Sequence, residues 1–180
     1  MIPASWQTQR LEFSAFQQSD AEVAKTIYDG NSHLKKHDPH FGDYPLSNFQ
    51  SLIESDCTGA SRDGKRLFFM RCIIDIESKV PLGYFQFELD TPEYGQCWIL
   101  MFVLGADAQA RGIGKETVEA IIAKTKEIGD IASIGLNVYA ENRRALEFWS
   151  NRGWRELYGV DLEEINGKHF TCLTLLQKFT

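Results

Sequence analysis

Runs of apolar residues separated by short polar turns fill the middle of the chain. Three such runs cover Leu67 to Asp75, Leu82 to Leu89 and Cys97 to Leu104. Because only a few residues separate them, they predict an antiparallel meander. A fourth run, Ile134 to Tyr139, alternates apolar residues with small or polar ones, which is the pattern of a half-buried strand.

Two dipeptides with a strong turn preference extend this pattern. Asn166-Gly167 separates Trp154 to Ile165 from His169 to Phe179 and predicts a two-residue hairpin. Asp63-Gly64 predicts the turn that leads into the first strand of the meander. An initial strand is expected from Thr8 to Phe13.

Helical patterns occupy other segments. Ser19-x-x-Glu22 and Ser47-x-x-Gln50 each match a capping box ahead of an apolar face, and two more helices are predicted after Gly114 and from Asn142. Residues 31–45 lack periodicity and are predicted to form a loop. The order is strand, two helices, three strands, helix, strand, helix and two strands. This predicts an α/β (α+β) protein with about seven strands and about four helices.

Composition narrows the class of protein. The 180 residues are 43% hydrophobic and 24% charged, which suits a single soluble globular domain over 1–180. No apolar run is long enough to cross a bilayer, and no secretory signal is evident, so a cytoplasmic protein is expected. The net charge of −6 and the lack of a basic cluster disfavour nucleic-acid and membrane partners. Four cysteines without metal-ligand spacing are expected to be reduced thiols: Cys57, Cys72, Cys97 and Cys172.

The segment Gln109-Ala-Arg-Gly-Ile-Gly114 lies between a predicted strand and a predicted helix. A helix start offers unpaired backbone N–H groups, and the helix dipole favours negative charge there. Gly112 and Gly114 lack a Cβ that would keep the backbone away from an anion. Arg111 and Lys115 add positive charge. The loop is therefore predicted to bind a phosphate or pyrophosphate.

Two common phosphate loops do not fit this segment. A Walker A loop requires Ser or Thr after Gly-Lys, but Glu116 follows Lys115. The dinucleotide fingerprint requires a third glycine where the chain has Thr117. The remaining pattern, Gln/Arg-x-x-Gly-x-Gly/Ala, resembles the acetyl-CoA loop of the GNAT N-acetyltransferase superfamily.

A second block strengthens this resemblance. After the strand that ends at Tyr139, the chain reads Asn142-x-x-Ala145, then Phe148-Trp149, then Gly153-Trp154. This is similar to the GNAT segment of strand, Asn-x-x-Ala, aromatic residue and Gly-Phe. The early Thr8-x-Arg10-Leu11 and the long first loop resemble the branch that contains ribosomal-protein N-terminal acetyltransferases.

The resemblance implies the GNAT acyl-CoA N-acyltransferase fold, with a central, mostly antiparallel mixed sheet. It implies direct transfer of an acetyl group from acetyl-CoA to a primary amine of a small molecule or a peptide N-terminus. The pantetheine arm would pair with the last residues of the third meander strand, and the pyrophosphate would lie on the glycine loop. Asn142 would either reach the cofactor or cap its helix. The implied cofactor-binding residues are Phe102, Val103, Leu104, Gln109, Ala110, Arg111, Gly112, Ile113, Gly114, Lys115, Asn142 and Trp149.

The residues for proton transfer are less well defined. Many relatives place a Tyr acid where this chain has Trp149, and an indole N–H is not a practical acid. Tyr139 and Ser150 are nearby candidates, with water as an alternative. Glu88 is the carboxylate best placed by position to act as a base, unless its strand face meets solvent.

The acceptor side is expected in the loop at residues 31–45. The resemblance makes His37, Phe41 and Tyr44 candidate substrate-binding residues, and imidazole titrates near neutral pH. The spacing of His33, His37 and His40 could suggest a metal, but no supporting ligands accompany them, so no metal is expected. The acceptor's identity and a homodimer stay open. A non-catalytic CoA-binding sensor or partner module is the alternative function, and a nucleotide-binding regulator is disfavoured by the missing Lys-Ser/Thr pair.

Overall fold

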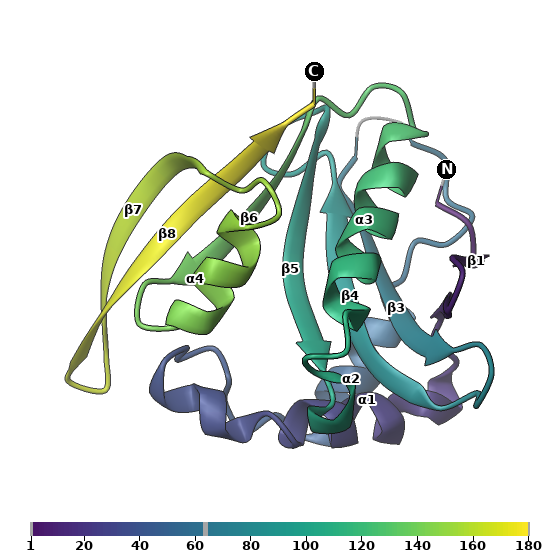
Figure 1. Cartoon of the computed structure of the whole chain (residues 1–180), viewed down its shortest axis with the longest axis horizontal. Helices are drawn as coiled ribbons and strands as arrows, with labels where there is room; N and C mark the ends of the chain where they lie inside the picture. The colour runs from purple at the N-terminus through teal and green to yellow at the C-terminus, as the bar shows by residue number, and fades with distance from the viewer. Residues whose placement is uncertain (1, 63–64, 180) are drawn as a thin grey trace.

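A computed structural model describes residues 2–62 and 65–179 of the chain, so the turn predicted at Asp63-Gly64 lies outside the described residues. One sheet of eight strands forms the centre, in the order β1-β2-β3-β4-β5-β6-β8-β7. Helices α3 and α4 lie over one face of this sheet, and α1 and α2 lie behind it (Figure 1). The expected α/β class and mostly antiparallel mixed sheet are confirmed, with one strand more than expected.

The strands are β1 (Ser5–Gln7), β2 (Leu11–Ala15), β3 (Leu67–Asp75), β4 (Pro81–Leu89), β5 (Gln96–Leu104), β6 (Ser133–Tyr139), β7 (Glu156–Ile165) and β8 (Lys168–Lys178). The α-helices are α1 (Ala21–Asp29), α2 (Leu46–Glu54), α3 (Ile113–Lys126) and α4 (Arg143–Ser150). Short 3₁₀ helices are η1 (Gln18–Asp20), η2 (Ser32–Lys36) and η3 (Ala106–Ala108). Every strand pair is antiparallel except β5 with β6, which run parallel.

Alternation along the central strands sends side chains into two separate cores. On β4, Phe85, Phe87 and Leu89 join one core with residues of α3 and α4, while Tyr84 joins the core under α1 and α2. Helices therefore cover both faces of the sheet. This answers the question left open for Glu88, which is 2% exposed on the second face and does not meet solvent.

The N-terminal segment differs from its prediction. Thr8 to Arg10 form the turn of a short hairpin between β1 and β2, rather than the start of one strand. The Thr8 backbone N–H donates to the Leu11 carbonyl at 2.8 Å, and the Leu11 N–H donates to Thr8 Oγ1 at 3.2 Å. A threonine side chain that bonds its own neighbouring backbone favours a turn over an extended strand.

Both predicted capping boxes are wrong in position. The box at the start of the first helical segment is formed by Gln17 and Asp20 around η1, and Ser19 only contacts Asp20. Helix α2 begins at Leu46 after Pro45, so Ser47 lies inside it. Pro45 is the residue that precedes the helix, with φ of −67° and an extended ψ of 160°, so α2 begins two residues earlier than a box at Ser47 predicts.

The C-terminal hairpin agrees with its prediction. Asn166 and Gly167 have φ of 53° and 72°, the left-handed values that a type I′ turn requires. Strand β8 pairs with β7 on one side and with β6 on the other. The hairpin thereby extends the sheet beyond β6 and forms a wall beside α4 (Figure 1).

Candidate active site

The parallel strands β5 and β6 separate partway along their length. Their pairing ends at Ile99 with Leu136, although both strands continue. On its other side β5 has a bulge, because Gln86 and Phe87 of β4 pair with Met101 and Ile99 and leave Leu100 unpaired. A bulge bends a strand and increases its twist. A cavity of about 660 Å³ opens where the strands diverge, and residues 98–104 and 136–139 line it.

The loop before α3 forms one end of this cavity. Gly112 has φ of 79° and Ala110 has φ of 59°, so the backbone turns sharply twice before the helix begins. Among the described residues, none accepts a hydrogen bond from the backbone N–H groups of 110–115. Six successive free N–H groups at a helix start are a site for an anion, because the helix dipole adds to their positive charge. The residues predicted for the phosphate loop are therefore brought together.

The two glycines of this loop have different reasons to be glycine. Gly112 needs its left-handed backbone, and its neighbourhood is open except for the Arg10 guanidinium. A Cβ on Gly114 would lie 2.9 Å from Cε2 of Phe148 on α4, closer than real Cβ contacts allow. Gly114 thus lets α3 and α4 approach each other.

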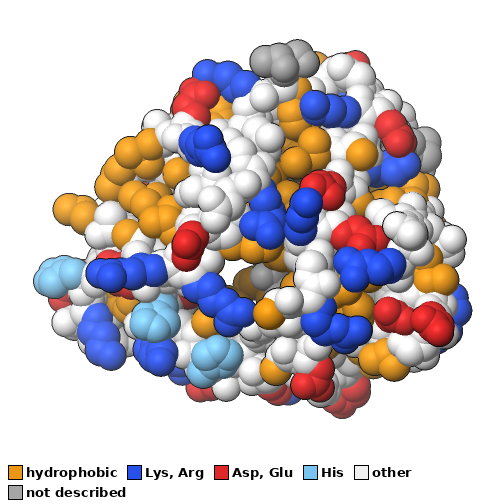
Figure 2. Space-filling view, viewed as in Figure 1, with side chains coloured by type: hydrophobic (Ala, Val, Ile, Leu, Met, Phe, Trp, Pro, Cys, Tyr) orange, Lys and Arg blue, Asp and Glu red, His pale blue; other side chains and the backbone are white. Residues whose placement is uncertain are grey.

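Positive side chains surround the opening near the phosphate loop. Lys115, Arg144 and Arg152 line the cavity. In Figure 2, Lys and Arg side chains lie around a hollow near the centre of this face. The net charge of the whole chain is negative, so this opening is a local basic region suited to phosphate groups.

Polar side chains fix the end of β5. The Leu104 carbonyl accepts hydrogen bonds from Asn31 Nδ2 and Gln109 Nε2, each at 3.1 Å. Asn31 is 3% exposed and also donates to the Ile27 carbonyl, so it ties α1 to the end of β5. The part of β5 between Ile99 and Leu104 has no strand on the side of the cavity. An extended ligand can therefore pair with this edge as an added strand.

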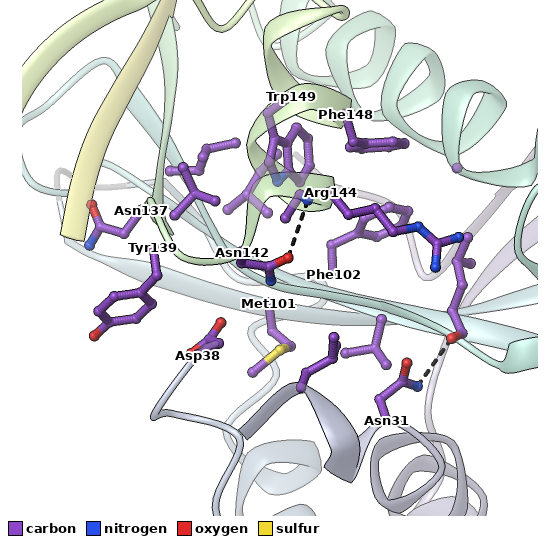
Figure 3. A pocket seen from close by; sticks show the side chains of 18 of the residues that line it. Asn31, Asp38, Met101, Phe102, Asn137, Tyr139, Asn142, Arg144, Phe148 and Trp149 are labelled. Carbon is purple, nitrogen blue, oxygen red and sulfur yellow. Dashed lines mark hydrogen bonds between the residues drawn. The ribbon is translucent and has the colours of Figure 1, made fainter. Parts of the chain in front are cut away.

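Helix α4 supplies the aromatic wall of the cavity. The Trp149 indole is 7% exposed and meets Phe102, Phe148 and Trp154 at centroid distances of 5.8, 5.0 and 5.0 Å. Figure 3 shows Trp149, Phe148 and Phe102 on the same side of the pocket. Asn142 caps α4, because its Oδ1 accepts from the Ala145 N–H at 3.2 Å. Its side chain also lines the cavity.

The opposite end of the cavity is acidic. The Tyr139 hydroxyl donates to Glu163 Oε2 at 2.7 Å and lies 3.1 Å from His40 Nδ1. Asp38 and Cys172 line the same end, which Figure 3 shows at Tyr139 and Asp38. Burial, followed by the hydrogen bond to Glu163, raises the pKa of Tyr139 far above its usual range. Burial also raises the pKa of Asp38, although the hydrogen bond and charge of His40 oppose this and Glu163 adds to it.

The loop at 31–45 is held in place by α1. The Tyr28 hydroxyl donates to the His40 carbonyl at 3.0 Å, and the Tyr28 ring stacks on Phe41 at 5.2 Å. Asp38 Oδ1 accepts from the His40 N–H at 3.0 Å, which closes an Asx turn. Part of the predicted loop is also helical, since η2 covers 32–36. This turn aims Asp38 and His40 at the cavity.

Most of the predicted site residues line the cavity, and five do not. The cavity is lined by Phe102, Val103, Leu104, Gln109, Ala110, Gly112, Gly114, Lys115, Asn142 and Trp149 from the predicted cofactor set, and by Tyr139 and Phe41. The residues outside the lining are Arg111, Ile113, Glu88, His37 and Tyr44.

Each of these five has another place in the structure. Ile113 is 2% exposed in the core, and Arg111 donates to the Asp107 carbonyl at 3.3 Å. Glu88 forms an ion pair with Arg66. His37 ends η2, and Tyr44 packs edge-on against Tyr28 at 5.5 Å. The backbone N–H groups of Arg111 and Ile113 nevertheless belong to the phosphate loop described above.

Sequence reasoning did not identify Glu163, Cys172 or Asn31 as site residues. Glu163 and Cys172 lie on the C-terminal hairpin, beyond Trp154, where the last family motif ends. In the structure Glu163 is partly buried between the exposed Leu162 and Glu164, but the sequence alone gives no sign of this burial.

The described residues contain neither a group of metal-binding side chains nor a long apolar helix. Within residues 2–62 and 65–179, no group of three or more His, Cys, Asp or Glu side chains could hold a metal ion. No helix in the same described ranges has the length and apolar character needed to span a bilayer.

A model of a known protein family matches most of the chain. Residues 32–154 match the family model described as "Acetyltransferase (GNAT) family". No curated protein shows a significant sequence match to the chain.

Solved structures share the fold at low sequence identity. The microcin C7 self-immunity acetyltransferase MccE, in complex with acetyl-CoA and AMP, has a TM-score of 0.75 at 16% identity, covering 99% of this chain and 98% of that one. RimL, a ribosomal L7/L12 alpha-N-protein acetyltransferase, has a TM-score of 0.75 at 17% identity, with 99% and 93% covered. Spermidine N-acetyltransferase from Vibrio cholerae, in complex with CoA and spermine, has a TM-score of 0.73 at 15% identity, with 95% and 96% covered.

The family model spans the loop before α3, the separated strands and α4, which supply most of the cavity lining. With the family match over more than half of its length and the fold shared along nearly all of it, the chain belongs to the GNAT acetyltransferase family.

Proposed function

We propose that this protein is an acetyl-CoA-dependent N-acetyltransferase that acts on a primary amine by direct transfer. The observation that carries the proposal is the run of free backbone N–H groups at 110–115, at one end of a cavity that also contains an unpaired strand edge. An anion site and an adjacent extended site fit the pyrophosphate and the pantetheine arm of CoA.

The acidic end of the cavity fits the amine. Glu163 and Asp38 line it, and among the described residues neither is paired with a Lys or Arg. A carboxylate near an ammonium group favours the charged amine, so these residues would draw a cationic acceptor into the cavity. Two solved neighbours support an amine acceptor, since one is named for spermidine and one for a protein α-amino group.

Direct transfer requires a free amine, and Glu163 is the base that we propose. An alkylamine with a pKa near 10.4 must lose a proton before its nitrogen can attack the thioester carbonyl. The Tyr139 hydroxyl fixes one oxygen of Glu163 and leaves the other available. When the nitrogen–carbon bond forms and the carbon–sulfur bond breaks, the nitrogen gives its second proton to water and the departing thiolate takes a proton from water, because Trp149 cannot supply it.

A covalent acetyl-cysteine is not part of this mechanism. Cys172 lines the acceptor end, but burial, with a smaller effect from Glu163, raises its pKa to about 11. The thiol is then almost entirely protonated at neutral pH, and a protonated thiol is a poor nucleophile.

Titration calorimetry and a thiol-release assay test the proposal. We expect wild-type protein to bind CoA and acetyl-CoA but not ATP, and to release free thiol from acetyl-CoA with at least one member of a panel of polyamines, amino acids and peptide N-termini. Gly112→Asp should abolish CoA binding, because it places a negative charge and a Cβ in the anion site. Glu163→Gln should retain CoA binding and lower the rate of thiol release on the order of 10²-fold, the scale of a lost general base.

Each outcome separates the candidate functions. CoA binding without thiol release for any amine would favour the non-catalytic CoA-binding module, which the Trp at 149 makes a specific alternative. ATP binding with no CoA binding would favour a nucleotide-binding regulator. Unchanged CoA affinity in folded Gly112→Asp protein would mean that the loop has another purpose.

A further inference from the structure

The turn between β1 and β2 contacts the first turn of α3, 106 residues away along the chain. Three groups of this turn converge on the carboxylate of Glu116. Thr8 Oγ1 donates to Glu116 Oε1 at 2.5 Å, and the Arg10 backbone N–H donates to the same oxygen at 3.2 Å. The Arg10 guanidinium contacts Glu116 Oε2 with Nε and Nη2, each at 2.7 Å.

Arg10 also reaches the phosphate loop itself. Its Nη1 donates to the Arg111 carbonyl at 3.4 Å, and its Nη2 is the nearest atom, at 3.5 Å, to the position that a Cβ on Gly112 would take. Sheet pairing does not require these contacts, because β2 pairs with β3 and not with α3. One side chain thus joins the carboxylate of α3 to the loop that offers the free N–H groups.

Without compensation by Arg10, the negative charge of Glu116 would weaken the binding of an anion at the loop. It lies in the first turn of α3, next to the N–H groups that we assign to the pyrophosphate. Burial acts to raise the pKa of Glu116, but the hydrogen bonds from Thr8 and Arg10 outweigh this and hold the pKa below its usual range. The group is therefore charged at neutral pH, and Arg10 offsets that charge.

We propose that the Thr8–Arg10 turn holds the phosphate loop in its anion-binding conformation, with Arg10 as a positioning residue for CoA. This inference rests on the proposed function, since it assumes that CoA is the ligand of the loop. It assigns a role to the Thr8-x-Arg10-Leu11 sequence, which the catalytic proposal leaves unexplained.

Three variants test the role of Arg10 by calorimetry with CoA and by steady-state kinetics. Arg10→Ala should weaken CoA binding about tenfold and raise the KM for acetyl-CoA by a similar factor, with kcat within about twofold. Arg10→Lys should be intermediate, because lysine retains the charge but not the planar fork. Arg10→Ala combined with Glu116→Gln should bind CoA more tightly than Arg10→Ala alone, because the uncompensated carboxylate is gone.

Lys79→Ala is the matched control. Lys79 lies between β3 and β4 and pairs with Glu12 of the β1–β2 hairpin at 3.5 Å, whereas Arg10 pairs with Glu116, so the loss of Lys79 should leave CoA affinity unchanged. Thermal unfolding of each variant verifies that it is folded. The double variant and the kcat-against-KM split are readouts that general loosening of the hairpin would not produce.

Two results would overturn the inference. One is an unchanged CoA dissociation constant in folded Arg10→Ala protein. The other is an equal loss of affinity in Arg10→Ala and in the double variant, since charge compensation would then have no part. A wild-type protein that binds no CoA would instead refute the proposed function, and the two failures are therefore distinguishable.

Discussion

The Trp149 side chain occupies the position where the family resemblance implies a tyrosine acid, and its surroundings explain why an indole fits there. Its ring is packed edge-on against Phe102 and Trp154, and Trp154 is completely buried with its Nε1 donating to the Ile134 carbonyl at 3.0 Å. Trp149 therefore belongs to the wall that joins α4 to the sheet. Its structural contacts account for its size and aromatic character without an acid–base role.

Replacing Trp149 with Phe should change kcat only a few-fold. The reason is that no proton donor is lost, while the aromatic packing against Phe102 is partly kept. Stability should fall by about 1–3 kcal/mol for the smaller ring. Stopped-flow or steady-state thiol release measures kcat, and CoA calorimetry on the same variant controls for damage to the cofactor site. A fall in kcat of about 10²-fold or more would identify Trp149 with the acid and contradict the assignment to water.

At the scale of elements, the loop between α1 and α2 is held by its contacts with Tyr28 of α1. Phe41 is 6% exposed and lies between the Tyr28 ring and the cavity, so its removal would leave a void and cost about 3–5 kcal/mol. A Phe41 and Tyr44 double replacement would thus confuse folding with acceptor binding. The hydrogen bond from Tyr28 to the His40 carbonyl offers a more specific test.

Tyr28→Phe should raise the acceptor KM by about fivefold and leave CoA affinity unchanged. The substitution removes one hydrogen bond, worth about 1 kcal/mol, and keeps the stacked ring. Asp38 and His40 would then be less firmly directed at the acceptor end. Tyr44→Phe is the control, because Tyr44 contacts the same ring from a more exposed position outside the cavity lining. An equal rise in the KM values of both substrates would indicate a general structural role for the loop.

Sequence patterns predicted those elements whose structure depends on residues that are close together in the sequence. The meander, the Asn166-Gly167 hairpin and the glycine loop all follow from local alternation or turn chemistry, and the family motifs located Asn142 and Trp149 in the cavity. The patterns failed where contacts between distant parts of the chain determine burial. Alternation left open whether the face of Glu88 meets solvent, because it cannot reveal that α1 and α2 pack on that face of the sheet.

The end of the cavity at the glycine loop was therefore predictable, and most of its acidic end was not. Residues 109–115 are contiguous, whereas the acceptor end joins Asp38, Tyr139 and Glu163 from three separate parts of the chain. Short-range reasoning also missed the hairpin at Thr8–Arg10, whose turn is stabilised by Glu116 on α3.

At the scale of the whole molecule, one ionic network joins three loops at the same end of the sheet. These loops connect α2 to β3, β4 to β5 and α3 to β6. Arg62 makes a two-pronged contact with Asp90, with Nε–Oδ2 at 2.8 Å and Nη2–Oδ1 at 2.7 Å. It also contacts Asp130, before β6, at 3.2 Å, and its guanidinium lies 4.9 Å from the ring centre of Tyr94. Bidentate arginine–carboxylate pairs of this kind are among the stronger polar contacts in proteins.

This network predicts a loss of stability in acid. The hydrogen bond from Arg62 lowers the pKa of Asp90 below that of an unfolded aspartate, near 3.9. A carboxyl with a lowered folded pKa stabilises the fold above the unfolded pKa, and this contribution is lost as the pH falls through the folded pKa. The free energy of unfolding should therefore decrease below about pH 4.

Urea unfolding at a series of pH values measures this effect, and Asp90→Asn is the informative variant. It should be less stable than wild type at pH 7, and the difference should shrink below about pH 4 as the wild-type carboxyl takes up a proton. Glu116 and Asp75 also have lowered pKa values and contribute with the same sign, whereas the raised pKa of Asp38 contributes with the opposite sign. A stability difference that does not vary with pH would contradict the role assigned to Asp90.

The place of β8 between β6 and β7 has a consequence for biosynthesis. A ribosome completes the phosphate loop, β5, β6 and α4 before it reaches residues 168–178, which supply the missing partner for β6. Until then the outer edge of β6 has open backbone groups that can pair with another nascent chain. Until β8 is made, Glu163 also has no fixed position, because its strand β7 pairs with β8. The half of the molecule with the proposed coenzyme site therefore forms first, and the half with the proposed acceptor site forms last.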